Sequence, residues 1–587
     1  MSNHPQQNRR LFSGAPLITL ICTIGLLLAS CAPASQPGVA PSNGASPDQG
    51  PAVALKTLRI GMIAGGEPKA GIALFGETGT GPPEFTFTYH AGLTVFDPQG
   101  SLLPRIAQKV PTIEDGDWQT FPDGRMEVTW KLRADVRWHD GTSLTADDFV
   151  FGLEILQDAQ VPAEPGPGAK LVSQAVARDA QTLVVSWKQP YILANSSGPT
   201  DLPAVPRHLL TNLYQAGDKQ AFVNSPYWTR EFVGLGPYRL GPWESGSYME
   251  ALAFDQYFLG PPKIGRIVVR FVGDGNALVA SLLSGDVDMT PMGSLKLSNL
   301  VTVKNAWEPT GLGTALPVFS GTRSVRFQFR DPSLPWAQDV RVRAAMLHAL
   351  DRQGIAEALQ FGLTSPADAM ISAEDPVYRL LEQRGLSRYP YDLARAERLL
   401  NEAGWTRGPD GTYRSSGGQP FSVEVRSTDK VDNVQEGQAV AAQWKAAGLN
   451  ATSYAFPDNS ADKAELRSVF PGVVTYQLTY VNDGLGHLTT ANISSARTRW
   501  NGSNYGGYSD PLFDRLSEQY RSTLDLVTRQ GLLADLLKMD ADKVLTIHLY
   551  YSVGTNTTAF RKGIRGPGSV PAGQLVNAWN VDSWEMD

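Results

Sequence analysis

One cysteine near the start of the chain is placed for covalent chemistry. Residues 28–31 read Leu-Ala-Ser-Cys, and they close a segment that begins with Arg9 and Arg10 and continues through apolar residues 17–28. A basic start, a short apolar centre and small residues at the end are typical of an export signal. The cysteine directly after the small residues indicates a bacterial lipoprotein signal. In such a signal the Cys31 thiol is acylated, with palmitate for example, and becomes the first residue of the mature protein. An ordinary secretory signal that contains a cysteine is the alternative.

This segment also constrains the remainder of the chain. Cys22, the only other cysteine, lies inside the apolar run, so the mature chain has no disulfide framework. The run is shorter than the roughly 20 apolar residues that a membrane span needs. We expect a lipoprotein signal peptide at 1–30 and a flexible linker, rich in Ala, Pro, Ser and Gly, at 31–54. The protein is then expected in the cell envelope, lipid-anchored to the outer face of the membrane, on the periplasmic side if two membranes are present.

No catalytic or cofactor motif follows the linker. The patterns G-x-S-x-G, H-E-x-x-H and G-x-x-x-x-G-K-[S/T] are absent from the sequence, and Glu84 stands where a dinucleotide loop beginning at Gly79 needs its third glycine. The seven histidines never fall at metal-ligand spacing. We therefore expect no enzyme, no cofactor and no metal. A secreted glycoside hydrolase is the enzymatic alternative, because its two carboxylates require no local motif.

The long remainder of the chain predicts several domains. Residues 55–587 exceed what one hydrophobic core usually supports. The formal net charge of −7, with both signs interspersed, argues against a nucleic-acid partner. Alternating apolar residues predict strands at 57–63, where the folded part begins, and at 126–132. Polar caps predict four helices, which begin at Thr145 (with Asp148 in a capping box), Asp339, Asp392 and Ser509-Asp510-Pro511.

Six short segments carry more information together than any one of them alone. They are 130–151, 233–238 (Val-Gly-Leu-Gly-Pro-Tyr), 283–288 (Leu-Ser-Gly-Asp-Val-Asp), 339–352, 391–405 and 504–516. In this order they resemble family 5 of the solute-binding proteins of ABC importers, the group of oligopeptide-, dipeptide- and nickel-binding proteins. His139, in the Trp-His-Asp-Gly turn of the first segment, is then expected to be structural. His487 lies in a Gly-containing loop, where it is either a solvated side chain or a site candidate.

The resemblance implies an α/β fold of the type II periplasmic-binding-protein class, with two lobes, a hinge and the extra domain of the large peptide-binding subgroup. The two passages between the lobes are expected near 325–327 and 549–551. By analogy, the domains are lobe 1 at 55–86, 206–320 and 551–587, an extra domain at 87–205, and lobe 2 at 321–550.

The resemblance also implies a function without bond making or breaking. A monomer would capture a solute between its lobes and deliver it to ABC permease subunits for transmembrane transport. A peptide is the first expectation for the solute, while oligosaccharides, opine-like compounds and metal chelates are compatible with the sequence. A lipid-anchored receptor that senses a solute without feeding a transporter is the alternative.

The resemblance assigns ligand contacts to one late region of the chain. Peptide-binding members hold the peptide's amino group with an aspartate in a W-x-A-D-Y segment, which is missing from residues 476–484 here. Asp483 is the nearest candidate for that anchor, and a solvated loop aspartate is the alternative. Trp500, Asn504 and Tyr505 follow and are further ligand-binding candidates, because they could supply an aromatic wall and a polar hook.

Overall fold

A computed structural model of the protein describes residues 56–64, 67–68, 72, 74, 83–163, 166–479, 483–553, 556–568, 570 and 576–587. The predicted signal peptide, Cys31 and the predicted linker lie outside the described residues.

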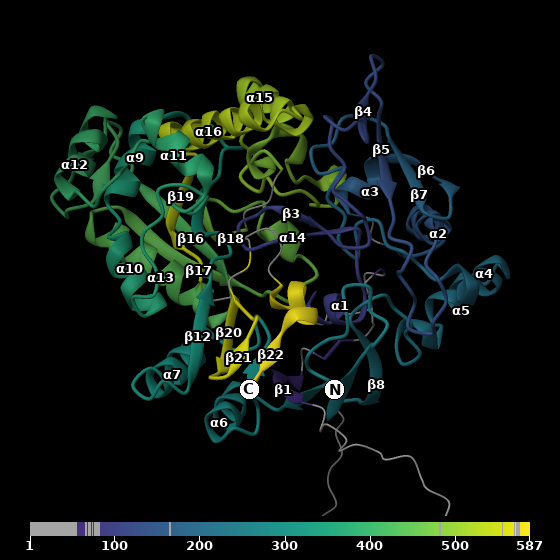
Figure 1. Cartoon of the computed structure of the whole chain (residues 1–587). Helices are drawn as coiled ribbons and strands as arrows, with labels where there is room; N and C mark the ends of the chain where they lie inside the picture. Colours follow the sequence, from purple (N-terminus) through teal and green to yellow (C-terminus); the bar gives the residue numbers. More distant parts are fainter. Residues whose placement is uncertain are drawn as a thin grey trace, which may run out of the picture. The chain divides into compact units, whose positions relative to one another are not determined.

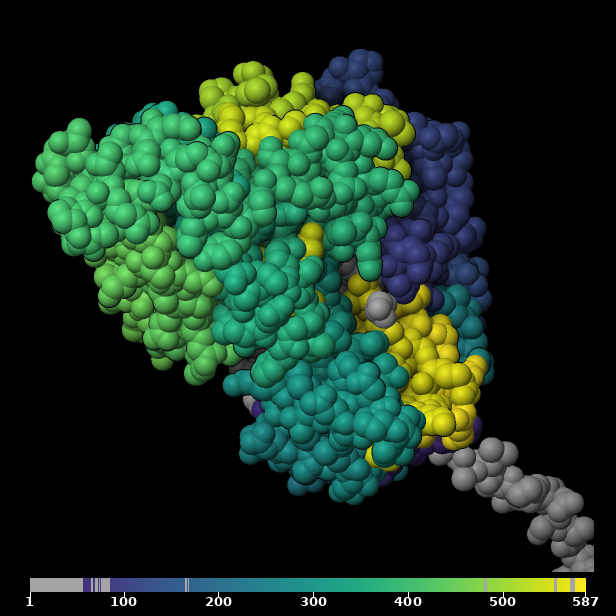
Figure 2. Space-filling model, turned by 90° about the vertical axis from the view of Figure 1, so that its left-hand side faces the viewer, coloured from purple at the N-terminus to yellow at the C-terminus, as the bar shows by residue number. Residues whose placement is uncertain are grey.

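A seven-stranded sheet forms the first large layer (Figure 1). The predicted first strand is present as β1 (Thr57–Ile63), which pairs in parallel with β10 (Arg266–Val272). The strand order is β12-β20-β11-β1-β10-β9-β8, with the other strands at β8 (Tyr238–Glu244), β9 (Tyr248–Ala253), β11 (Met289–Thr290), β12 (Gly313–Val318) and β20 (Asn556–Arg561). Two helices, α6 (Gly275–Ser284) and α7 (Leu297–Trp307), pack against this sheet through an apolar cluster. On the face in Figure 2, the C-terminal segment lies beside teal segments from the middle of the chain.

A five-stranded sheet forms the second large layer. Its order is β17-β16-β18-β13-β19, with the strands at β13 (Thr322–Phe327), β16 (Ser422–Thr428), β17 (Asn450–Phe456), β18 (Val473–Leu478) and β19 (Thr546–Tyr551). One face packs on α9 (Val340–His348), α10 (Arg352–Gln360) and α13 (Val431–Ala446). The other face is covered by α11 (Pro376–Gln383), α15 (Pro511–Ser522) and α16 (Leu526–Lys543). Helices on both faces explain why β13, between β18 and β19, is almost entirely buried.

A four-stranded antiparallel sheet forms a third core, within the predicted extra domain. Its order is β4-β5-β7-β6, with the strands at β4 (Trp118–Thr120), β5 (Met126–Lys131), β6 (Val172–Asp179) and β7 (Thr182–Trp187). Helix α2 (Ala146–Gln157) packs against β6 and β7. The remaining strand pairs are β2 (Thr94–Phe96) with β3 (Leu102–Pro104), β14 (Thr406–Arg407) with β15 (Tyr413–Arg414), and β21 (Ile564–Arg565) with β22 (Glu585–Met586). The remaining α-helices are α1 (Pro83–Tyr89), α3 (Pro167–Leu171), α4 (Arg207–Gln215), α5 (Lys219–Val223), α8 (Pro335–Gln338), α12 (Leu393–Glu402) and α14 (Lys463–Leu466).

The predicted helix caps are confirmed. The Thr145 N–H donates to the Asp148 carboxylate at 2.9 Å and opens α2. The carboxylates of Asp339, Asp392 and Asp510 accept backbone N–H groups in the first turns of α9, α12 and α15. Each cap satisfies donors that have no partner within the helix itself.

His139 has the structural role that the sequence predicted. Its Nδ1 accepts the Gly234 N–H at 3.1 Å, and its Nε2 contacts the Gly236 carbonyl oxygen at 3.0 Å. A Cβ at Gly234 would lie 1.9 Å from the Tyr89 carbonyl oxygen, which explains why this turn contains glycine. Burial lowers the pKa of His139 to about 4, so the ring is neutral near pH 7.

The chain passes twice between the two large sheets. Phe319, Ser320 and Gly321 connect β12 to β13, and Ser552 and Val553 follow β19 on the way to β20. These passages differ from the expected positions, since 325–327 lies inside β13 and 549–551 lies inside β19. The passages lie outside the expected positions because β13 and β19 are still part of the five-stranded sheet over those residues.

Candidate functional site

The ends of all five strands of the second sheet meet along one edge. Strands β16, β17, β18 and β19 share one direction and end at this edge, whereas the antiparallel β13 begins there at Thr322. Ligands of open α/β sheets bind outside the carboxyl ends of parallel strands. Helix α13 begins shortly after the last residue of β16, so its first turn lies at the same edge. This edge is the candidate functional site.

The two passages between the sheets are hydrogen-bonded to each other beside this edge. The Ser320 N–H donates to the Ser552 carbonyl oxygen at 2.9 Å, and the Ser552 N–H donates to the Gly321 carbonyl oxygen at 2.8 Å. Gln477, near the end of β18, donates from Nε2 to the Ser320 hydroxyl at 3.0 Å. Gly321 has a φ of +127°, and a Cβ there would lie 1.9 Å from the Leu478 carbonyl oxygen. The passages and the strand edge therefore form one connected unit.

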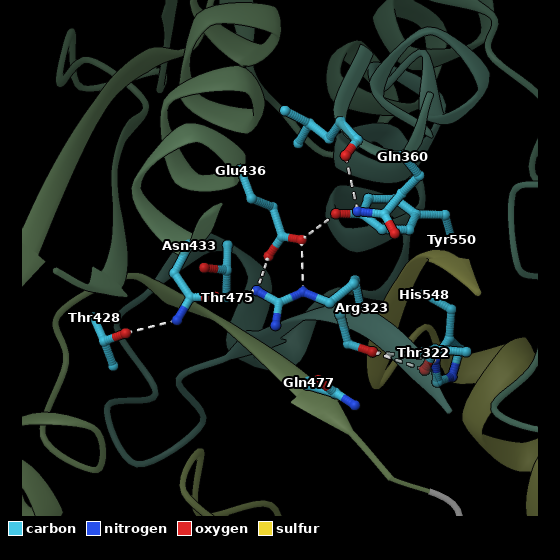
Figure 3. A network of polar contacts seen from close by, with 12 residues as sticks. Thr322, Arg323, Gln360, Thr428, Asn433, Glu436, Thr475, Gln477, His548 and Tyr550 are labelled. Atoms are coloured by element: carbon cyan, nitrogen blue, oxygen red, sulfur yellow. Dashed lines mark hydrogen bonds and ion pairs between the residues drawn. The ribbon is translucent and has the colours of Figure 1, made fainter. Parts of the chain in front are cut away.

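A buried ion pair lies at the same edge (Figure 3). Arg323 donates from Nε and Nη2 to the two carboxylate oxygens of Glu436, at 2.8 and 2.9 Å. Its Nη2 also donates to Asn433 Oδ1 at 2.7 Å, and Asn433 Nδ2 donates to the Thr428 hydroxyl at 2.6 Å. The Tyr550 hydroxyl donates to Glu436 Oε2 at 2.7 Å. The Glu436 side chain is 1% exposed, so this network fixes β13, β19 and α13 relative to one another.

The charges within this network stabilise each other. Burial alone would lower the pKa of Arg323, but the Glu436 carboxylate outweighs burial and raises it. Burial, followed by the Glu436 charge, raises the pKa of the Tyr550 hydroxyl well above its ordinary value. Tyr550 therefore stays protonated near pH 7 and donates its hydroxyl hydrogen to Glu436.

A hydroxyl, an imidazole and a carboxylate line up behind the edge, on the opposite face of the sheet. The Thr322 Oγ1 lies 2.9 Å from His548 Nδ1, and His548 Nε2 lies 3.0 Å from Asp540 Oδ2. This order of groups is used in nucleophilic catalysis. However, Thr322 is 0% exposed, His548 5% and Asp540 2%, so a substrate has no access to the hydroxyl. In this structure the arrangement is a buried polar contact between β13, β19 and α16.

Asp483 lies close to the candidate site in sequence but is engaged within its own loop. Its Oδ1 accepts the Gly486 N–H at 3.1 Å, and a Cβ at Gly486 would lie 2.5 Å from Asp483 Oδ2. Burial raises the pKa of Asp483, although the Gly486 N–H opposes this shift. His487, in the same loop, is 6% exposed, so it is a buried side chain rather than a solvated one.

The other three predicted contact residues lie in a loop that follows this one. The Asn504 side chain is buried and fully paired: Nδ2 donates to the carbonyl oxygens of Thr489 and Tyr508, and Oδ1 accepts the N–H groups of Gly507 and Tyr508. Asn504 therefore holds the loop together.

Tyr505 and Trp500 differ in their surroundings. Tyr505 is buried, packs edge-on against Tyr476 and lies under the Arg326 guanidinium, 4.9 Å from ring centroid to Cζ. Trp500 is partly exposed and adopts a left-handed backbone conformation with φ of 60°. The structure brings Asn504 and Tyr505 into packed interior positions and leaves Trp500 accessible.

Arg323 and Glu436 were not among the residues predicted from the sequence. They are 113 positions apart, and no short motif contains both. One signal was present, because the strand Thr322–Phe327 carries two arginines and is buried at most of its positions. A charged residue in a central strand needs a buried partner, which points to an ion pair but does not name the partner.

Within the described ranges, no cluster of three or more His, Cys, Asp or Glu side chains is placed to hold a metal ion. Among the helices of the described residues, none combines the length and hydrophobicity of a membrane span.

Comparison with known proteins identifies relatives of this chain. The family model for bacterial extracellular solute-binding proteins, family 5 (middle), matches residues 110–496. Protein XP55 of Streptomyces lividans is 31% identical over 367 residues, which cover 61% of this chain and 60% of that protein. The chain thus matches less than two thirds of the length of that curated relative.

Solved structures share the fold. The oligopeptide-binding protein of Thermus thermophilus, complexed with a pentapeptide, superimposes with a TM-score of 0.65 at 22% identity, covering 90% of this chain and 96% of that one. NikZ of Campylobacter jejuni, in complex with Ni(L-His), gives a TM-score of 0.67 at 21% identity and covers 90% and 99% of the two chains. These likenesses confirm the predicted type II fold with two lobes.

Proposed function

Because the chain belongs to family 5 of the bacterial extracellular solute-binding proteins, we propose that it captures a solute between two lobes and delivers it to an ABC permease. The main support for this proposal is that the two passages between the large sheets are adjacent and are hydrogen-bonded to each other beside a strand edge. Two short connections side by side allow the lobes to rotate about one axis and close over a ligand. In this proposal the ligand is bound and released without chemical change.

A peptide is the proposed ligand class. The pentapeptide complex of one structural neighbour supports this choice. Because another neighbour is in complex with Ni(L-His), a small metal chelate is the alternative ligand. Asp483 is the proposed partner for the peptide amino group, and Trp500, Asn504 and Tyr505 are proposed to shape the same region. Because Asn504 and Tyr505 are buried, they would act by holding the loop in place.

The proposed domains follow the sequence analysis. Lobe 1 would comprise 55–86, 206–320 and 551–587, the extra domain 87–205, and lobe 2 321–550. The sheet assignments support these bounds, since the three large sheets fall into the three proposed parts.

Acylation of Cys31 is proposed to tether the protein, which would act as a monomer at the outer face of the membrane. A tether confines the protein to a thin layer above its permease and raises its effective concentration there. A receptor that senses the solute without transport would share this fold.

Affinity selection tests the proposed ligand class. The purified protein is incubated with a pool of tri- to pentapeptides, and retained peptides are identified by mass spectrometry. Retention of peptides by the wild type supports the proposal. Weaker retention by Asp483→Asn would support the anchor, and unchanged retention would remove Asp483 from the site.

A further inference from the structure

Arg323 stands at the strand edge with its orientation already fixed. It is the second residue of β13 and comes two positions after Gly321, so it lies next to the passage between the sheets. Three hydrogen bonds, two to Glu436 and one to Asn433, use Nε and Nη2 of the guanidinium. A side chain held in this way has lost its rotamer freedom before any ligand arrives.

One nitrogen of this guanidinium, Nη1, takes no part in these three hydrogen bonds. In Figure 3, Nη1 points away from Glu436. Among the described residues, Nη1 has no hydrogen-bond partner, and the Arg323 side chain is 13% exposed. The structure therefore presents an oriented pair of N–H donors at the edge where ligands of such sheets bind.

The charge of Arg323 is compensated before a ligand binds. Glu436 cancels it through a bidentate contact, and the exposed Asp432 in the first turn of α13 adds a further negative charge nearby. A ligand carboxylate at Nη1 would approach these two carboxylates and be repelled by them. A neutral oxygen would receive the same hydrogen bonds without that repulsion.

We infer that Arg323 is a specificity-determining ligand contact, with Nη1 donating to a neutral oxygen of the bound solute, such as a peptide carbonyl. Glu436 is a positioning residue: it holds the guanidinium in place, and its negative charge balances the positive charge of Arg323. This inference rests on the proposed function, because it names what the proposed binding site selects.

Two peptide pools test the inference. Both have free amino ends; one ends in an amide and the other in a carboxylate. The wild type is expected to retain the amide pool better. Arg323→Gln should weaken retention of the amide pool by about tenfold or more, since a hydrogen bond to a charged donor is lost. Arg323→Lys, which can still pair with Glu436, should also weaken it. The control Arg395→Gln, at an exposed position of α12, should change nothing.

The Glu436→Gln variant distinguishes a ligand contact from a structural role. This substitution leaves the Arg323 charge uncompensated, so retention should shift from the amide pool toward the carboxylate pool. The circular dichroism spectrum of the variant should match that of the wild type. Equal loss of both pools, or Arg323 variants that bind like the wild type, would overturn the inference and leave the proposed function standing. If the wild type retains neither pool, the proposed peptide ligand itself fails. Thermal unfolding of each variant establishes that folded protein was tested.

Discussion

Ser320 and Ser552 join the two passages between the large sheets: the N–H of Ser320 donates to the carbonyl oxygen of Ser552 at 2.9 Å. These residues are 232 positions apart, yet their pairing makes two distant chain segments behave as one short connection. The strand edge with Arg323 and Glu436 begins directly beside it. Motion at the connection and binding at the edge are therefore expected to be coupled.

Gly321 is expected to be irreplaceable in this connection. Gly321→Ala would place a Cβ 1.9 Å from the Leu478 carbonyl oxygen, at a φ of +127° that side chains rarely adopt. We expect a loss of unfolding free energy of about 2 kcal/mol or more, measured by urea denaturation. Gly273→Ala is the control, since a Cβ there meets nothing within 4 Å, and it should unfold like the wild type. Equal stability of both variants would contradict the strained geometry.

The ion pair at the edge is expected to be strongly coupled. Removing one partner leaves a buried charge without compensation, so Glu436→Leu alone should destabilise the protein by about 3–5 kcal/mol. The double variant Arg323→Met with Glu436→Leu should recover much of that loss, because no buried charge remains. Chemical denaturation of the two single variants and the double variant measures this coupling. Additive losses would mean that the two side chains do not stabilise each other.

An apolar contact links the predicted extra domain to the predicted lobe 2. Ile192, from the extra domain, belongs to the cluster under α11 and α16, and Leu524 packs against both this cluster and the core of the four-stranded sheet. Leu524→Asp should favour an open arrangement, seen as a larger radius of gyration in X-ray scattering and a weaker affinity for the ligand. Leu526→Asp, at a side chain that is already 54% exposed, is the control. An unchanged radius in both variants would show that this contact does not hold the parts together.

Stability should fall as the pH drops below neutrality. Burial lowers the pKa of His139 to about 4, below its ordinary value of 6.5, so the unfolded chain binds the proton more readily. The contribution of His139 is complete above pH 6.5 and is lost as the pH falls from 6.5 to 4, with a total on the order of 3 kcal/mol. Urea denaturation between pH 4 and 7 measures this slope. His139→Gln should be less stable at pH 7 but flatter across this window, and a slope as steep as that of the wild type would refute the assignment.

The starts of the helices and the positions of the strands were predictable from local sequence. The candidate site was not, because it forms between residues that are far apart in the chain. Asp339, Asp392 and Asp510 were predictable as caps because each bonds to a backbone N–H within three residues. Arg323 and Glu436 were not, because their contact depends on which face of the five-stranded sheet α13 covers. Asn504 and Tyr505 were predicted to line a ligand pocket as a polar hook and part of an aromatic wall, but their burial within the loop is a tertiary property that residue type does not specify.

The proposed acylation of Cys31 can be tested directly. The full chain, expressed in a bacterial host, should carry acyl groups at Cys31 and partition into the detergent phase of a Triton X-114 extract. Cys31→Ser should shift the protein to the aqueous phase. An unmodified cysteine detected by mass spectrometry in wild-type protein would favour the ordinary secretory signal instead.

Native mass spectrometry of the full chain carrying Cys31→Ser, incubated with a tri- to pentapeptide pool, determines whether the protein binds a peptide without altering it. We expect one peptide per chain, released at its original mass after prolonged incubation, because the proposed function is to bind a solute and leave it chemically unchanged. Absence of any peptide adduct, or accumulation of shortened peptides in excess over protein, would contradict it.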